Sequence, residues 1–151
     1  MTIEIRRLEP GDGALVMVAG ELFDALPDPQ ATERFLTSPG HHLLLAVDDN
    51  RPVGFVTGVE MTHPDKGTEM FLYELGVIEA AWRQGIGTRL VEALRDLAAE
   101  RGCYGMWVLT EDDNEAAIAT YRRAGAQPAP GPVMLGWRLA GREPAESQRP
   151  R

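Results

Sequence analysis

The chain has 151 residues, 44% of them hydrophobic, which suits one domain with a single core. Its formal net charge of −8 disfavours nucleic acid and anionic membranes as partners and suits a cationic substrate. No apolar run approaches the ~20 residues of a membrane span, and the first residues predict a strand rather than a signal peptide, so we expect a cytoplasmic protein. Cys103 is the only cysteine, which excludes an intrachain disulfide and a cysteine-based metal site.

The predicted elements mix strands and helices in an α/β (α+β) order. Alternating or continuous apolar runs predict strands over residues 3–8, 42–47, 53–61, 70–78, 104–110 and 133–139. Apolar residues at helical spacing predict helices over about 11–23, 30–37, 86–101 and 114–123. We therefore expect one domain over 1–139, followed by a disordered tail over 140–151 that is rich in polar residues and proline.

A glycine-rich turn joins the long fourth strand to the helix that begins at Ile86. Gly85 and Gly87 let the backbone approach a ligand closely. The free N–H groups and the positive end of the helix dipole favour phosphate there. Two nucleotide-binding loops are excluded, because the only lysine of the chain is Lys66 and because Leu90 stands where a dinucleotide fingerprint needs its third glycine. The turn therefore predicts a cofactor that carries phosphate but belongs to neither class.

This loop resembles the acetyl-coenzyme A loop of the GCN5-related N-acetyltransferases, the GNAT superfamily, with Gln/Arg-x-x-Gly-x-Gly/Ala at the start of a central helix. The resemblance covers nearly the whole domain and implies the GNAT fold, a mixed, mostly antiparallel sheet of six to seven strands with about four helices. Trp82 occupies the place of the usual Gln or Arg, and Arg83 is the candidate for the missing charge. The implied cofactor is acetyl-CoA, and the implied contacts in the loop are Arg83, Gln84, Gly85, Ile86, Gly87 and Thr88.

The end of the fourth strand, Leu75-Gly76-Val77, matches the family's strand before this loop. By that resemblance the Leu75 N–H polarises the acetyl carbonyl and the Val77 backbone pairs with the pantetheine arm. A preorganised N–H at a developing oxyanion can matter by ~3 kcal/mol. Gly76 indicates either a bulge or splay that frees those backbone groups, or relief of crowding.

The segment Asn114-x-x-Ala117-x-x-x-Tyr121 resembles the family's asparagine turn and the helix that carries its acid tyrosine. Seven residues at 3.6 per turn put Asn114 and Tyr121 on nearly one helix face, with the small Ala117 between them. A neutral tyrosine there can protonate the leaving thiolate. The alternative is that Asn114 is a helix N-cap and Tyr121 a core residue.

Glu74 directly precedes the backbone that would polarise the acetyl group, and alternation along a strand places it on one face with Leu72 and Gly76. A buried carboxylate can accept the proton of an attacking amine, directly or through water, and the alternative is an edge charge paired with arginine. The run from Phe71 to Val77 resembles the Tyr-x-Tyr-Asp-Leu-Ala-Val strand of GNAT-type aminoglycoside 3-N-acetyltransferases, with glutamate in place of aspartate.

The resemblance implies acetylation of a primary amine by direct attack in a ternary complex, on an aminoglycoside-like polycation, an activity that would confer antibiotic resistance. The candidate substrate-binding residues are Asp24, Asp28, Tyr73, Glu74, Glu111, Asp112 and Asp113. Glu60 and Glu69 are further acidic residues beside the predicted cleft. The alternative for Glu111, Asp112 and Asp113 is plain surface exposure or an electrostatic role at the start of the next helix.

Other interpretations of the acceptor and the activity stay open. A different small amine, a polyamine or a protein amine could be the acceptor, or the chain could be a module that binds acetyl-CoA without turnover. His41, His42 and His63 lack metal-ligand companions in the sequence, so we expect structural roles and no metal. The terminal strand offers an edge for a homodimer.

Overall fold

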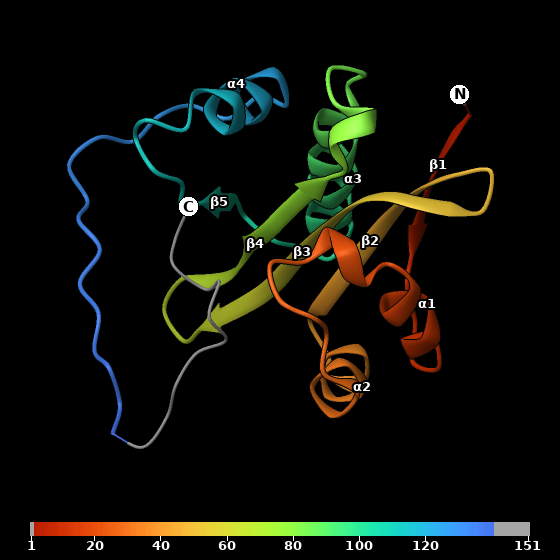
Figure 1. Ribbon diagram of the computed structural model, residues 1–151. Helices are drawn as coiled ribbons and strands as arrows, with labels where there is room; N and C mark the ends of the chain where they lie inside the picture. Colours follow the sequence, from red (N-terminus) through yellow and green to blue (C-terminus); the bar gives the residue numbers. More distant parts are fainter. Residues whose placement is uncertain (1, 141–151) are drawn as a thin grey trace.

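The computed structural model describes residues 2–140. In chain order its elements are β1 (Ile3–Arg7), α1 (Gly13–Val18), η1 (Gly20–Leu22), α2 (Pro29–Thr37), β2 (His41–Asp48), β3 (Arg51–His63), β4 (Gly67–Val77), η2 (Glu79–Ala81), α3 (Ile86–Glu100), β5 (Met106–Val108) and α4 (Glu115–Arg123). Figure 1 shows a twisted central sheet with α3 on one face and α1 and α2 on the other. None of the helices within residues 2–140 is long and apolar enough to cross a bilayer.

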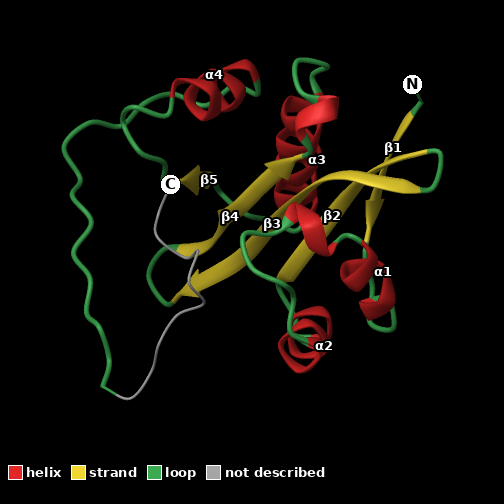
Figure 2. Cartoon of the chain, in the orientation of Figure 1, coloured by secondary structure: helices red, strands yellow, loops and turns green. Residues whose placement is uncertain are grey.

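The five described strands follow the chain order β1-β2-β3-β4-β5 across the sheet. The first four pair antiparallel, and β5 pairs parallel with β4 (Figure 2). The tight turn between β2 and β3 has positive φ at Asp49 (47°) and Asn50 (66°), the left-handed conformation that hairpin turns of two residues require. The sheet is therefore mixed and mostly antiparallel, as the sequence predicts.

Both faces of the sheet are covered, which explains the continuous apolar run of β2. Leu44 and Ala46 face α3, and the neighbouring Leu43 and Leu45 face α1 and α2. On the α3 side, the helix buries one stripe: Ile86, Leu90, Val91, Leu94, Leu97 and Ala98. Apolar burial stabilises by ~25 cal/mol per Å² removed from water, so burial of this stripe accounts for much of the free energy that holds α3 on the sheet.

A β-bulge on β4 changes which side chains face which helix. Thr57 of β3 pairs with Glu74 and the next residue, Gly58, pairs with Leu72, so Tyr73 is the extra residue on β4. Leu72 and Leu75 consequently both pack on the α3 side, whereas Glu74 faces the other side. The prediction that Glu74 shares a face with Leu72 is wrong for this reason, although it does share one with Gly76.

Most predicted elements are confirmed, with three differences. The helix expected over 11–23 is split into α1 and the short η1, and the fifth strand is limited to Met106–Val108. The strand expected over 133–139 does not form, so the sheet has fewer strands than the six to seven predicted. A strand needs a neighbour for its backbone hydrogen bonds, and this segment runs away from the sheet in Figure 1. The expected disorder of the tail falls on 141–151, outside the described residues, apart from residue 140.

Candidate active site

The glycine loop has the geometry of an anion-binding helix start. Gly85 is the N-cap of α3, with φ of 76°, and Arg83 also has a positive φ, of 62°. The first N–H groups of α3 have no acceptor within the helix, so they point outward together with the positive dipole end. A Cβ at Gly85 would meet nothing within 4 Å, which means that the loop is open on this side.

Gly87 allows close packing, because it lies where α3, α4 and β4 meet. A Cβ there would lie 3.3 Å from the Thr120 side chain of α4 and 3.9 Å from the side chains of Leu75 and Val77 on β4. The missing side chain lets α4 and the end of β4 approach the first turn of α3. The loop, the strand and the second helix of the predicted site are therefore brought together by packing.

The sheet opens between β4 and β5 directly beside this loop. The two strands pair only from Met70 to Leu72 of β4, and the residues beyond the bulge have no β5 partner among those described. The Ile78 N–H bonds to the Val53 carbonyl, so antiparallel alternation turns the backbone groups of Leu75 and Val77 away from β3 and into this opening. An extended ligand can add there like a further strand.

Trp82 takes part in the site in a way that its sequence position did not indicate. Its indole N–H donates to the Val77 carbonyl oxygen at 2.8 Å, across the turn that carries η2. The ring is 58% exposed and lies beside the loop that begins at Arg83. Trp82 therefore ties the end of β4 to the loop, while one lone pair of the Val77 carbonyl and its N–H stay available to a ligand.

Glu74 lies on the face opposite α3, and burial raises the pKa of its carboxyl, with a further increase from the negative charge of Asp24. Its backbone N–H donates to the buried Thr57 hydroxyl at 3.1 Å, which satisfies the donor displaced by the bulge. No ion pair reaches the Glu74 carboxylate within residues 2–140. The alternative of an arginine-paired edge charge is thus not what the structure contains.

The segment before α2 crosses this same face of β4. A Cβ at Gly76 would lie 2.8 Å from the Phe55 ring and 2.9 Å from the Leu22 carbonyl oxygen, so glycine is required for the crossing. The Phe23 and Phe55 rings pack with centroids 4.1 Å apart and fix the segment. Crowding, rather than a bulge at Gly76, explains this glycine, since the bulge lies at Tyr73. The crossing brings Asp24 close enough to act on the Glu74 charge.

Tyr121 lies on the other side of β4, half-buried against the cluster that includes α3. Burial raises the pKa of its phenol, so the side chain is neutral at physiological pH. The Asn114 side chain accepts the Ala117 N–H at 3.1 Å, so Asn114 is a helix N-cap, as one of the two sequence interpretations holds. Its amide N–H groups remain available to a ligand.

The other predicted acidic residues do not act on the charge of Glu74. The Asp28 carboxylate caps α2 by accepting the Ala31 N–H at 2.7 Å. Glu69 accepts a hydrogen bond from the Tyr104 hydroxyl at 2.9 Å, away from the opening. Glu111, Asp112 and Asp113 are exposed in the loop before α4. Tyr73 is 57% exposed, and its ring lies edge-on to Phe71. Of the predicted acidic set, Asp24 is the one whose charge acts on Glu74.

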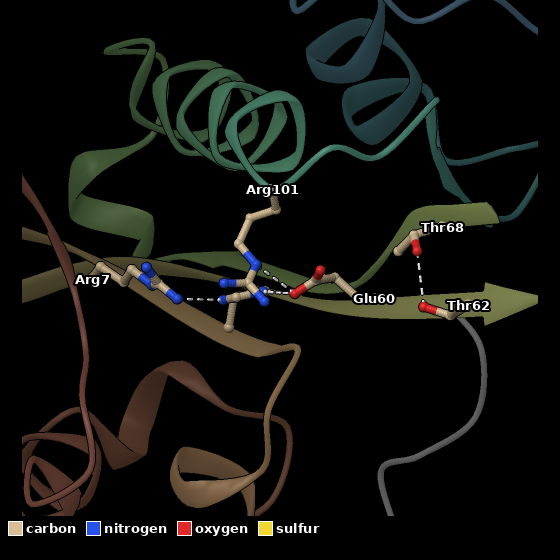
Figure 3. A network of polar contacts seen from close by, with 6 residues as sticks. Arg7, Glu60, Thr62, Thr68 and Arg101 are labelled. Atoms are coloured by element: carbon tan, nitrogen blue, oxygen red, sulfur yellow. Dashed lines mark hydrogen bonds and ion pairs between the residues drawn. The ribbon is translucent and has the colours of Figure 1, made fainter.

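Glu60 belongs to a structural network, drawn in Figure 3. Its carboxylate accepts His42 Nε2–H at 2.7 Å and Arg101 Nε–H at 2.8 Å, and Arg7 donates to His42 Nδ1 at 3.0 Å. Because arginine has no acceptor, Nδ1 must carry the lone pair and His42 is the neutral Nε2–H tautomer. Burial, together with the charges of Arg7 and Arg101, lowers the His42 pKa and agrees with this assignment.

The remaining histidines have no part in the opening. His63 contacts Asp65 in the exposed turn after β3, and the His41 ring lies against Phe35. No group of three or more potential metal ligands comes together within residues 2–140. Thr57 and Phe55 are residues of the site that sequence reasoning missed. The signal for Thr57 was a lone hydroxyl in the middle of a buried strand.

Comparison with known proteins defines the family. The family model described as "Acetyltransferase (GNAT) family" matches residues 14–126, which include the loop, the opening and both helices of the site. The chain belongs to this family. The acetyl donor of this family is acetyl-CoA.

Curated relatives match over part of their length. N-alpha-acetyltransferase 30 of Schizosaccharomyces pombe is 32% identical over 81 residues, which are 54% of this chain and 54% of the relative. L-2,4-diaminobutyric acid acetyltransferase of Nocardia farcinica is 32% identical over 100 residues, 64% of this chain and 50% of the relative. The chain thus spans about half the length of these relatives.

Solved structures share the fold over nearly the whole chain. An aminoglycoside acetyltransferase from an uncultured soil metagenomic sample, in complex with sisomicin, superposes with a TM-score of 0.81 at 21% identity, covering 91% of this chain and 96% of that one. An aminoglycoside N-acetyltransferase in complex with CoA gives a TM-score of 0.77 at 17% identity, again covering 91% and 96%. At these identities the likeness establishes the fold alone.

Proposed function

We propose that this protein transfers the acetyl group of acetyl-CoA to a primary amine of an aminoglycoside-like polycation, by direct attack in a ternary complex. The observation that carries the proposal is Glu74, a carboxylate with a raised pKa beside an open strand edge, next to the second carboxylate of Asp24. A carboxylate base and a negative site for a cation are the two things that such a reaction needs from the acceptor side.

The donor fits the residues of the opening. The N–H groups after Gly85, with Gln84 and Thr88 beside them, would hold the pyrophosphate, with Arg83 as the nearest cation. The outward backbone of Val77 would pair with the pantetheine arm, and Asn114 and Ala117 would line its other side. Bound acetyl-CoA supplies an activated thioester carbonyl. The Leu75 N–H would donate to that carbonyl oxygen as negative charge develops on it.

Glu74 would take the proton of the attacking amine. An ammonium has no lone pair, so the amine must lose a proton before it can attack, and a carboxylate whose pKa is raised is a better base than an ordinary one. Glu74 faces the side crossed by the Leu22–Asp24 segment, which is therefore the side from which the amine would arrive.

Tyr121 would give a proton or a hydrogen bond to the departing thiolate. Its neutral phenol lies on the α3 side of β4, opposite Glu74. Base and acid are thus separated by the strand whose edge would hold the thioester. This arrangement lets the amine enter from one face and the thiol leave toward the other without the two groups exchanging a proton directly.

The polycationic acceptor is favoured by the acidic surroundings of Glu74 and by the net charge of −8. Several structural neighbours are aminoglycoside acetyltransferases. The 3-amino group as the position modified rests on the resemblance of the β4 sequence alone. Tyr73, Glu111, Asp112 and Asp113 are the further acceptor contacts in this proposal, and the Asp28 carboxylate would have to leave its helix cap to join them.

A second candidate acceptor is a smaller amine, such as an amino acid with a side-chain amine or a protein N-terminus. The names of the two curated relatives favour it, since one acts on diaminobutyric acid and the other is an N-alpha-acetyltransferase. The same Glu74 would serve as base, because the chemistry at the attacking nitrogen is unchanged.

Release of free thiol from acetyl-CoA, measured with a panel of amines, tests the proposal. Kanamycin-like and gentamicin-like compounds, diaminobutyrate, spermidine and a peptide with a free N-terminus separate the acceptor classes. The highest kcat/KM is expected for an aminoglycoside, and mass spectrometry and NMR of the product identify the nitrogen. The highest value for diaminobutyrate or the peptide would select the second candidate. Acetyl-CoA binding by calorimetry without turnover of any amine would identify a binding module instead.

A further inference from the structure

The backbone N–H groups of β4 change direction across the bulge at Tyr73. The Met70 N–H donates to the Gly105 carbonyl at 2.9 Å, on the β5 side of the strand. The Ile78 N–H, directly after β4, donates to the Val53 carbonyl at 3.0 Å, on the β3 side. In a regular strand, residues an even number apart direct their N–H groups to the same side. The extra residue at Tyr73 therefore accounts for the reversal.

The Thr57 side chain accepts the first N–H group beyond this reversal. The Glu74 N–H points toward β3 and donates to the Thr57 hydroxyl oxygen at 3.1 Å. Thr57 is only 5% exposed, so its surroundings hold the side chain in place. Its neighbours on β3 face α3, since Val56 belongs to the core cluster there and a Cβ at Gly58 would lie 2.8 Å from the Leu94 side chain. The hydroxyl is thus fixed on the face of the sheet that carries Glu74.

Anchoring this one N–H group sets the positions of two groups of the proposed reaction. The Glu74 Cα is bonded to the anchored nitrogen, so the anchor fixes the start of the side chain that ends in the carboxylate. The N–H of the next residue, Leu75, points to the opposite side of the strand, into the opening between β4 and β5. A shift of the Glu74 backbone would therefore move the carboxylate and turn the Leu75 N–H together.

We propose that Thr57 is a positioning residue, whose hydroxyl fixes both the Glu74 carboxylate and the Leu75 N–H for acetyl transfer. This inference rests on the proposed function, in which the carboxylate takes the proton of the amine and the N–H donates to the acetyl carbonyl oxygen. Thr57 acts through the Glu74 backbone and needs no contact with a substrate. Its loss should lower kcat and leave the KM for acetyl-CoA nearly unchanged, because the glycine loop at Gly85 is a separate element.

Two substitutions at Thr57 separate the role of the hydroxyl from that of packing. Thr57→Val keeps the β-branched shape, which suits a buried strand, but removes the acceptor of the Glu74 N–H. Thr57→Ser keeps the acceptor but loses a buried methyl group. With the amine of highest kcat/KM in the thiol-release panel, we expect kcat at neutral pH to fall by ~10–100-fold in Thr57→Val. Thr57→Ser should stay within a few-fold of wild type. A side chain that only packs would give the reverse order and overturn the inference.

Thr62→Val is the matched control. Thr62 also lies on β3, and its hydroxyl also reaches β4, where it contacts the Thr68 hydroxyl at 2.9 Å (Figure 3). This pair lies at the opposite end of the two strands from Val77 and the glycine loop. The control should keep kcat and the KM for acetyl-CoA near wild type. A loss of kcat as large as that in Thr57→Val would mean that any hydroxyl between the two strands matters, and would overturn the inference.

Amide hydrogen exchange followed by NMR tests the anchor without any turnover. The Glu74 amide should be protected in wild type and in Thr57→Ser, and should lose this protection in Thr57→Val. The Ile78 amide, which bonds to the Val53 carbonyl, should stay protected in all three proteins. An unprotected Glu74 amide in wild type would overturn the inference without any variant. Full protection of that amide in Thr57→Val would overturn it as well.

Glu74→Gln separates failure of this inference from failure of the proposed function. Wild-type kcat in both Glu74→Gln and Thr57→Val would overturn the proposed function, and the positioning role with it. A loss in Glu74→Gln beside wild-type kcat in Thr57→Val would overturn the positioning role alone. A Thr57→Val protein whose only defect is a raised KM for acetyl-CoA would also overturn it, because the hydroxyl would then serve donor binding.

Discussion

Glu60 and Glu74 lie on adjacent strands of one sheet and have opposite electrostatic surroundings. Burial acts against the charge of Glu60, but its hydrogen bonds from His42 and Arg101 outweigh that cost, and its pKa is lowered. Burial also acts against the charge of Glu74, but its charged neighbour is Asp24, and its pKa is raised. The first carboxylate stabilises the fold, whereas the second is kept at a cost in stability, as is typical of a functional group.

The largest expected effect comes from removing the negative charge of Glu74. Glu74→Gln keeps the shape of the side chain but removes the base, and we expect kcat/KM with the best amine at neutral pH to fall by roughly 10²–10⁴. Glu69→Gln is the matched control, since Glu69 also lies on β4 but bonds to Tyr104 instead. It should change the rate little. An equal loss in both variants would mean that any charge on β4 matters and not Glu74 in particular.

Removing the other glutamate should affect stability rather than turnover. Glu60→Leu leaves the buried His42 N–H and the Arg101 guanidinium without their acceptor, so we expect the free energy of unfolding to fall by about 3 kcal/mol. Urea unfolding measures it. The exposed Glu100→Gln, one position from Arg101, serves as control. Unchanged stability in Glu60→Leu would show that the network is not a structural one.

A substitution at Gly76 tests whether the Leu22–Asp24 segment, which brings Asp24 to Glu74, matters for binding the amine. Gly76→Ala puts a Cβ at 2.8 Å from the Phe55 ring and 2.9 Å from the Leu22 carbonyl, so a loss of about 2 kcal/mol is expected together with a raised KM for the amine. In Gly105→Ala the new Cβ meets nothing within 4 Å, and both quantities should stay near wild type. A raised KM for acetyl-CoA alone would place the crossing on the donor side instead.

The smallest expected effect is on thermal stability, and its sign follows from the raised pKa of Glu74. The raised pKa of Glu74 means that folding disfavours its charged form, so its favourable contribution is present below the ordinary carboxyl pKa and is lost as pH rises through the raised value. Glu74→Gln should therefore raise Tm by a few degrees at pH 7 and by less at pH 4. A lower Tm at pH 7 would contradict an unfavourable burial of this charge.

The sequence was sufficient for the parts of the molecule that depend on local chemistry. The positive φ at Gly85 and the buried stripe of α3 follow from conformational freedom and periodicity, and both agree with the structure. The face of Glu74 could not be read from alternation, because one extra residue at Tyr73 reverses it. A bulge depends on the neighbouring strand, which a single strand's sequence does not describe.

The sequence likewise does not show which side chains from distant parts of the chain come into contact. Nothing in the sequence around Glu60 shows that Arg101, 41 residues later, neutralises its charge, so sequence alone places Glu60 among the acidic residues of the cleft. The Trp82 hydrogen bond to the Val77 carbonyl is local. The sequence does not indicate it, because a tryptophan at that place departs from the family pattern. The terminal strand was predicted from a correct alternation, yet strand formation also needs a partner edge.

The pH dependence of kcat/KM for thiol release, compared between wild type and Glu74→Gln, tests the role of Glu74 most directly. For wild type we expect a rise through the ionisation of Glu74, centred above the usual range of a glutamate carboxyl, followed by a second rise as the substrate amine loses its proton. The variant should lack the first rise and approach wild type at high pH. The same first rise in both proteins would contradict Glu74 as the base.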